Sequence, residues 1–135
     1  MKYFILLILF LFQSDGKITV KDPWMRPAPK SFNTAFYCTV INNGSKADTL
    51  YKAASNISDD VQIHETYKKG DLLGMRPVKD LIVAPQDSLV FKPGGYHIML
   101  MNLNQEAVLN QKKMISLFFK TAGEVKVQAS IGSSQ

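Results

Sequence analysis

The only two histidines of the chain share one spacing pattern with two methionines. His64 is followed by ten residues and Met75, then by twenty-one residues and His97, and after one more residue by Met99. Neutral imidazole nitrogens and thioether sulfurs form a soft, uncharged ligand set, and soft sulfur ligands select Cu(I) over the hard cations. Structural zinc sites instead favour cysteine and histidine, while calcium and magnesium take carboxylate oxygens. The pattern therefore predicts a Cu(I) site built from these four side chains.

The first two ligands fit a β-hairpin. If a tight turn is centred on residues 69–70, His64 lies directly opposite Met75, with Cβ atoms about 4.5 to 5.5 Å apart. Gly74 removes a side chain next to Met75, where the backbone has to bend or another group has to approach closely. We therefore expect both side chains to reach one ion.

The other two ligands fit a single strand. Residues two apart on a strand point to the same face, so His97 and Met99 share a face, with Cα atoms roughly 6.6 Å apart. Met101 shares that face but lies about 13 Å from His97 along the strand, so we expect it to be core or site wall. We expect His97 and Met99 to lie nearest to the exit of the ion.

The apolar pattern indicates an all-β fold. Apolar and polar residues alternate over seven short segments, which is typical of half-buried strands: 34–41, 61–67, 81–83, 88–91, 97–101, 115–119 and 125–131. Turn-forming residues separate these segments, and 102–113 is predicted to be a long connection. No segment predicts a helix. The pattern predicts a single domain with an antiparallel β-sandwich or small barrel.

The start of the chain predicts export. Residues 1–16 hold a lysine and then an apolar run over 3–12, as in a secretory signal peptide, and this run is shorter than the roughly 20 residues that span a bilayer. We place the cleavage after Gly16, which leaves 17–135 as the mature domain in the periplasm, without stable membrane insertion. An uncleaved anchor is the alternative. No cysteine for lipid attachment follows the apolar run.

Charge and cysteine content narrow the function classes. Sixteen basic residues against eleven acidic ones give a net charge of +5. The basic residues are scattered rather than clustered with aromatic ones, so we expect no nucleic-acid partner. The single cysteine, Cys38, alternates in phase with Phe36 and Val40, which predicts a buried small apolar residue. A blue-copper electron carrier needs a cysteine thiolate with two histidines, and Cys38 has no histidine within 25 residues.

The spacing pattern resembles that of the periplasmic copper chaperones of the PCuAC type. The residues around it, from Met75 to Val78 and from Lys92 to Met101, strengthen the resemblance, which covers about residues 18–131. It implies a cupredoxin-like β-sandwich. It also implies that His64, Met75, His97 and Met99 hold Cu(I) near the surface, and that the protein is not an enzyme.

The resemblance further implies delivery of copper to the binuclear centre of cytochrome c oxidase. The expected partners are an oxidase subunit or a thioredoxin-like protein of the Sco type, and we expect a monomer. Three other functions stay open at this point: copper storage or resistance, electron transfer by a cupredoxin-like copper site, and a metal-free domain that binds other envelope proteins.

Overall fold

The computed structural model describes residues 17–132, and this range consists of ten β-strands joined by turns and loops. The strands are β1 (Ile18–Met25), β2 (Thr34–Asn42), β3 (Asp48–Ala54), β4 (Asp60–Lys69), β5 (Leu72–Pro77), β6 (Leu81–Val83), β7 (Ser88–Phe91), β8 (Tyr96–Met101), β9 (Lys112–Phe119) and β10 (Gly123–Ile131). The described chain contains no helix, and so none with the length and apolar character that crossing a membrane requires. The predicted signal segment, 1–16, lies outside the described residues.

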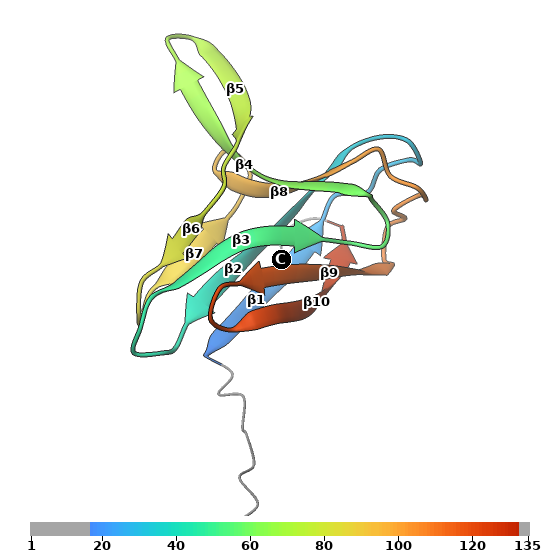
Figure 1. The fold of residues 1–135 in the computed structure, drawn as a ribbon. Coiled ribbons are helices and arrows are strands. Elements are labelled where there is room, and N and C mark those ends of the chain that lie inside the picture. The colour runs from blue at the N-terminus through green and yellow to red at the C-terminus, as the bar shows by residue number, and fades with distance from the viewer. Residues whose placement is uncertain (1–16, 133–135) are drawn as a thin grey trace, which may run out of the picture.

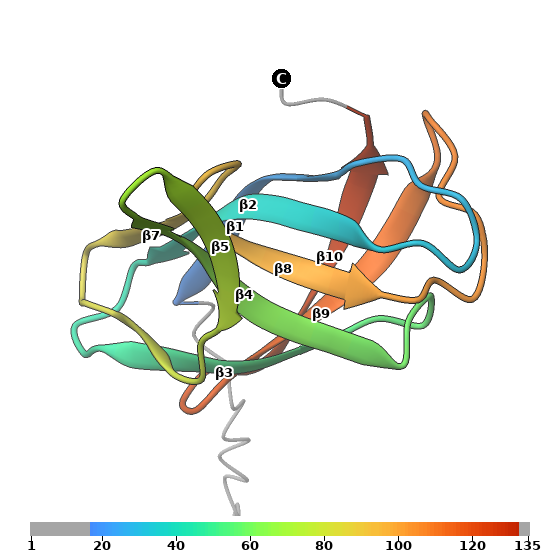
Figure 2. The ribbon, with the colours of Figure 1, turned by 90° about the horizontal axis from the view of Figure 1, so that it is seen from above.

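The strands form one continuous sheet that curls into two layers. Their order is β5-β4-β8-β7-β2-β1-β10-β9-β3-β6, with β8 also paired to β2. All pairings are antiparallel except two, β1 with β10 and β7 with β8. Strands β4, β8 and β2 form one layer and β3, β9 and β10 the other (Figure 2). The predicted all-β sandwich is therefore confirmed.

All seven predicted strands are present, as β2, β4 and β6 to β10, and the predicted long connection runs to residue 111. Strands β1 and β3 were not predicted, and β5 was predicted only as the second strand of the hairpin that carries Met75, not from alternation. Both β1 and β3 contain a shift of register, after Lys21 and after Leu50, and such irregularities break the alternation that predicts strands. Asp22 within β1 adopts a positive φ of 50°. Strand β5 has exposed apolar residues on both faces, so it shows no alternation either.

Side chains on β4 and β8 point alternately to the two faces of the sheet, so that one face packs in the core and the other carries the site. Ile63 pairs with Ile98, and both are buried among core residues of the two layers. Neighbouring residues on a strand point to opposite faces. The next pair along, His64 with His97, must therefore point away from the core.

The β4–β5 hairpin projects from the body of the sandwich (Figure 1). Lys69 pairs with Leu72, so the turn is formed by Gly70 and Asp71, one residue later than predicted. Gly70 has a φ of +61°, and the first central position of a type II′ hairpin turn takes glycine for this reason. Met75 thus lies opposite Thr66, and the predicted pairing of His64 with Met75 is wrong. Because the error is two positions, Met75 stays on the predicted face.

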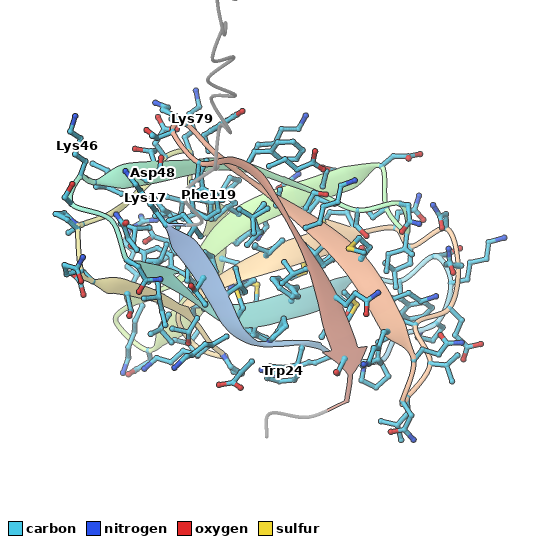
Figure 3. The ribbon with its side chains drawn as sticks, turned by 90° about the horizontal axis from the view of Figure 1, so that it is seen from below. Lys17, Trp24, Lys46, Asp48, Lys79 and Phe119 are labelled. Carbon is cyan, nitrogen blue, oxygen red and sulfur yellow. The ribbon has the colours of Figure 1, made fainter. Side chains whose placement is uncertain are left out.

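A buried carboxylate, that of Asp48, holds the start of β3 in place. Asp48 lies close to Lys17, where the described chain begins (Figure 3). Its oxygens accept hydrogen bonds of 2.9 Å from the backbone N–H groups of Thr121 and Ala122. These bonds tie the start of β3 to the β9–β10 turn.

Candidate metal site

Three neighbouring strands carry the four predicted ligands on one face. The register places three cross-strand pairs in succession: Gln62 with Met99, His64 with His97, and Thr66 with Met75. The rings of His64 and His97 lie edge to face, with centroids 5.6 Å apart. The face points away from the core, and the four side chains converge on it from β4, β5 and β8.

The four side chains differ in their exposure to solvent. His64 is 8% exposed and His97 only 2%, whereas Met75 on the projecting hairpin is 58% exposed. Met99 is half-buried. The expectation that His97 and Met99 lie nearest to the exit is therefore wrong, because the projecting hairpin carries Met75 outward while β8, which holds both residues, runs through the middle of its layer. The site has two buried nitrogen donors and an outer thioether.

Each histidine uses one ring nitrogen in a hydrogen bond and leaves the other without a partner. His64 Nε2 lies 2.7 Å from Gln62 Oε1, and His97 Nδ1 lies 3.2 Å from the backbone oxygen of Gly95. The remaining nitrogens, His64 Nδ1 and His97 Nε2, are buried and have no hydrogen-bond partner. A buried polar atom without a partner is costly, and a bound metal ion would remove this cost. The two free nitrogens therefore fit a metal ion.

The surroundings of His64 favour the neutral form of its ring. Burial lowers the pKa of His64, and the positive charge that His97 can carry lowers it further, while Asp60 opposes both by raising it. Only a neutral imidazole has a lone pair available for a metal ion. The pKa shift thus favours the ligating form.

A cavity of about 320 Å³ opens beside His97. It is lined by Arg26, Pro27, Asn33, Thr34, Ala35, Tyr37, Thr66, Met75, Pro93, Gly94, His97 and Met99. Three of the four predicted ligands line it, and His64 lies next to it, against His97.

None of the described residues that line the cavity is acidic, and residues 17–132 hold no group of three or more histidine, cysteine or carboxylate side chains placed to bind a metal. The donor set suits a soft ion, because calcium and magnesium need carboxylate oxygens. Met101 is half-buried and lies outside the cavity wall.

The hairpin that carries Met75 is braced by a stack that the sequence analysis did not predict. Tyr67 lies directly opposite Gly74, and a Cβ added to Gly74 would lie 2.5 Å from Tyr67 Cζ. The guanidinium carbon of Arg76 is 4.8 Å from the centre of the Tyr67 ring, and Arg76 also pairs with Glu65. The close approach expected at Gly74 is thus made by an aromatic ring. This stack covers the face of the hairpin opposite to Met75.

The substitution Gly74→Ala should loosen this hairpin. The Tyr67 ring would have to swing away from the new methyl group and release Arg76, at a cost of about 1 kcal/mol or less, because the contact is partly exposed. Amide hydrogen exchange over residues 65–76 should become faster. In a Tyr67→Ala background the same glycine substitution should have little further effect. Equal effects in both backgrounds would contradict the stack.

Cys38 lies on the other side of the sheet from the histidines. It is buried with Phe36 and Val40 in the core, as predicted, and burial raises the pKa of its thiol to about 12. A blue-copper site needs a thiolate beside two histidines. The position of Cys38 therefore argues against an electron-carrier site.

A thiol reagent tests the burial of Cys38. At pH 8 the folded protein should not react with a disulfide reagent, because the reactive thiolate is both absent and covered. The unfolded protein should react with one equivalent. Rapid reaction of the folded protein, followed by absorbance, would contradict the buried placement.

The fold and the site together define an all-β domain that carries two imidazoles and two thioethers, all uncharged potential ligands, on one outer face. The family model with the description "Putative lipoprotein LpqE-like" matches residues 18–131, and the chain belongs to this LpqE-like family. A protein of Leifsonia xyli subsp. xyli, "Putative lipoprotein Lxx21020", is 34% identical over 108 residues, which cover 79% of this chain and 64% of that protein. The chain spans less than two thirds of the length of the curated relatives it matches.

Solved structures show the same fold. The copper-bound PCuAC domain from PmoF2 is 25% identical, with a TM-score of 0.72, and the match covers 87% of this chain and 94% of that one. The apo PCuAC domain from PmoF1 is 28% identical, with a TM-score of 0.72 and coverage of 87% and 95%. The chain therefore has the cupredoxin-like β fold of the PCuAC domains, and the predicted resemblance is confirmed.

Proposed function

We propose that this protein is a copper chaperone that binds one Cu(I) through His64, Met75, His97 and Met99. The observation that carries the proposal is the pair of buried, unpartnered ring nitrogens, His64 Nδ1 and His97 Nε2, on the face that also bears both methionines. Cu(I) is the soft ion that such a set selects. The similarity to a copper-bound PCuAC domain supports the same conclusion.

The arrangement suits transfer better than permanent retention. All four ligands are uncharged, so replacing one of them with a neutral ligand of an acceptor leaves the charge of the complex unchanged. Met75 is the most exposed of the four, and its hairpin stands away from the body (Figure 1). We infer that an acceptor approaches on the hairpin side, displaces Met75 first, and leaves the buried histidines to release the ion last.

The proposed place of action is outside the cytoplasm, in the periplasm. The apolar run over 3–12 and the lipoprotein description of the family support export. We propose that the protein acts as a monomer, without enzymatic activity of its own. The proposed destination of the copper is the binuclear centre of cytochrome c oxidase, reached directly or through a thioredoxin-like protein of the Sco type.

Two measurements test the proposal. A competition titration with a chromogenic Cu(I) chelator under reducing conditions should show one tightly bound Cu(I) per chain. Incubation of the loaded protein with the copper-free soluble domain of an oxidase subunit, in the absence and in the presence of a thioredoxin-like protein of the Sco type, should then produce the absorption bands of the binuclear centre. Failure to bind would reject the chaperone. Binding without transfer to either proposed acceptor would favour storage or resistance.

A further inference from the structure

Gln62 connects a carboxylate to one of the proposed ligands. It lies on β4 two residues before His64, on the same face, and directly opposite Met99. Its side-chain Nε2 donates a hydrogen bond of 3.0 Å to Asp60 Oδ1, while its Oε1 lies 2.7 Å from His64 Nε2. The three side chains form a chain of hydrogen bonds that ends at the imidazole ring.

The chemistry of this chain allows only one arrangement of hydrogens. An ionised carboxylate only accepts hydrogen bonds, so Asp60 holds the amide of Gln62 with its NH₂ group toward the carboxylate. The amide oxygen is left facing His64. Because this oxygen also only accepts, His64 Nε2 must carry the hydrogen and donate it. The lone pair of the neutral ring is then on Nδ1, which is the buried nitrogen without a partner.

The second histidine is oriented differently. The carbonyl oxygen of Gly95 accepts from His97 Nδ1, so the lone pair of His97 is on Nε2, the other unpartnered nitrogen. The backbone orients His97, whereas a side chain orients His64. Substitution can therefore remove the support of His64 without touching that of His97.

We propose that Gln62, held by Asp60, is a positioning residue that fixes His64 as the Nε2–H tautomer and presents its Nδ1 to the bound Cu(I). The inference rests on the proposed function for the identity of the ion, but the tautomer is a property of the copper-free protein. Partners that orient metal-binding histidines in this way typically contribute 10- to 100-fold to metal affinity.

The test compares Gln62→Leu with a variant that rebuilds the chain of hydrogen bonds. Gln62→Leu should lose the hydrogen-bonded Nε2–H proton of His64 in the NMR spectrum and weaken Cu(I) binding about tenfold. The signals of the His97 ring and the melting temperature should stay close to those of the wild type, because Gln62 is only half-buried.

The rebuilt variant combines Asp60→Asn with Gln62→Glu, which keeps the net charge. In it the new amide at position 60 would donate to the new carboxylate at position 62, and this carboxylate would still accept from His64 Nε2. Both the Nε2–H proton signal and the affinity for Cu(I) should therefore return.

The outcomes separate this inference from the proposed function. A wild-type His64 in the Nδ1–H form, or Cu(I) bound through its Nε2 as shown by the ¹⁵N shift, would overturn the role of Gln62. Unchanged affinity and an unchanged His64 ring signal in Gln62→Leu would do so as well. If the wild type bound no Cu(I), the proposed function would fail, and the ring tautomer of the copper-free protein would still decide whether Gln62 orients His64.

Discussion

Replacing Met75 and Met99 together with leucine should abolish tight Cu(I) binding while the fold remains intact. Among the residues that the structure describes, the two thioethers are the only sulfur donors on the wall of the cavity beside His97, and leucine conserves their volume without offering a ligand. Little packing is lost, because Met75 is 58% exposed and Met99 is half-buried. The affinity should fall by more than the roughly 10- to 100-fold that results from changing a residue that only supports a ligand. Competition with a Cu(I) chelator measures this loss.

Met101→Leu is the matched control for this experiment. Met101 lies on the same strand and face as Met99, opposite Asp60, and is also half-buried, but it does not line the cavity. Its substitution should leave the affinity for Cu(I) unchanged. An equal loss in Met101→Leu would mean that strand packing, not thioether ligation, is being measured. Undiminished binding in the double variant would contradict the proposed ligand set.

Much of the fold could be predicted because apolar and polar residues alternate regularly along most of the strands that build the core. In β4 and β8 the pairs Ile63–Ile98 and His64–His97 follow one another, so the same period of two that predicts the strands also predicts which face holds the histidines. The common face of His97 and Met99 followed from the same rule. The strands that escaped prediction, β1 and β3, are those whose register shifts.

The position of the hairpin turn and the tautomer of His64 depend on interactions that the alternation of apolar and polar residues does not reveal. The position of the hairpin turn depends on which residue takes a positive φ, and Gly70 takes it at the first central position. The tautomer of His64 depends on Gln62, a residue that looks ordinary in the sequence because its role needs both Asp60 and the folded strand. One signal was available: Gln62 and His64 are two apart, and so share a face.

The affinity for Cu(I) should fall as the pH is lowered, because protons compete with the ion for the histidine nitrogens. An unperturbed imidazole has a pKa of about 6.5. Burial and the nearby His97 lower the pKa of His64, so proton competition at this residue should begin only below that value. At acid pH the logarithm of the affinity should change by up to about two for each pH unit, one for each histidine ligand that must lose a proton to bind the ion. The measurement is a chelator competition repeated from pH 8 to pH 5.

The substitution His64→Leu isolates the second histidine. This variant should bind Cu(I) more weakly, and its affinity should change by about one logarithmic unit per pH unit in the acidic range. A pH-independent affinity in the wild type would show that the histidines are not ligands. Substitution of Met75 or Met99 should lower the affinity without changing its dependence on pH, because a thioether binds no proton in this range. The dependence on pH therefore distinguishes the histidine ligands from the methionine ligands.

The same pKa shift links acid to the stability of the copper-free protein. The unfolded chain has a His64 with an ordinary pKa of about 6.5, and the folded chain has a lower one. Between these two values the unfolded state binds more protons, so the free energy of unfolding decreases as the pH falls through this window. Urea unfolding at several pH values should show this decrease, and His64→Leu should reduce it. Bound Cu(I) should oppose it, since an ion that binds only the folded state stabilises that state. Protons and Cu(I) therefore compete for one ring nitrogen, His64 Nδ1, and have opposite effects on the free energy of unfolding: protons lower it and Cu(I) raises it.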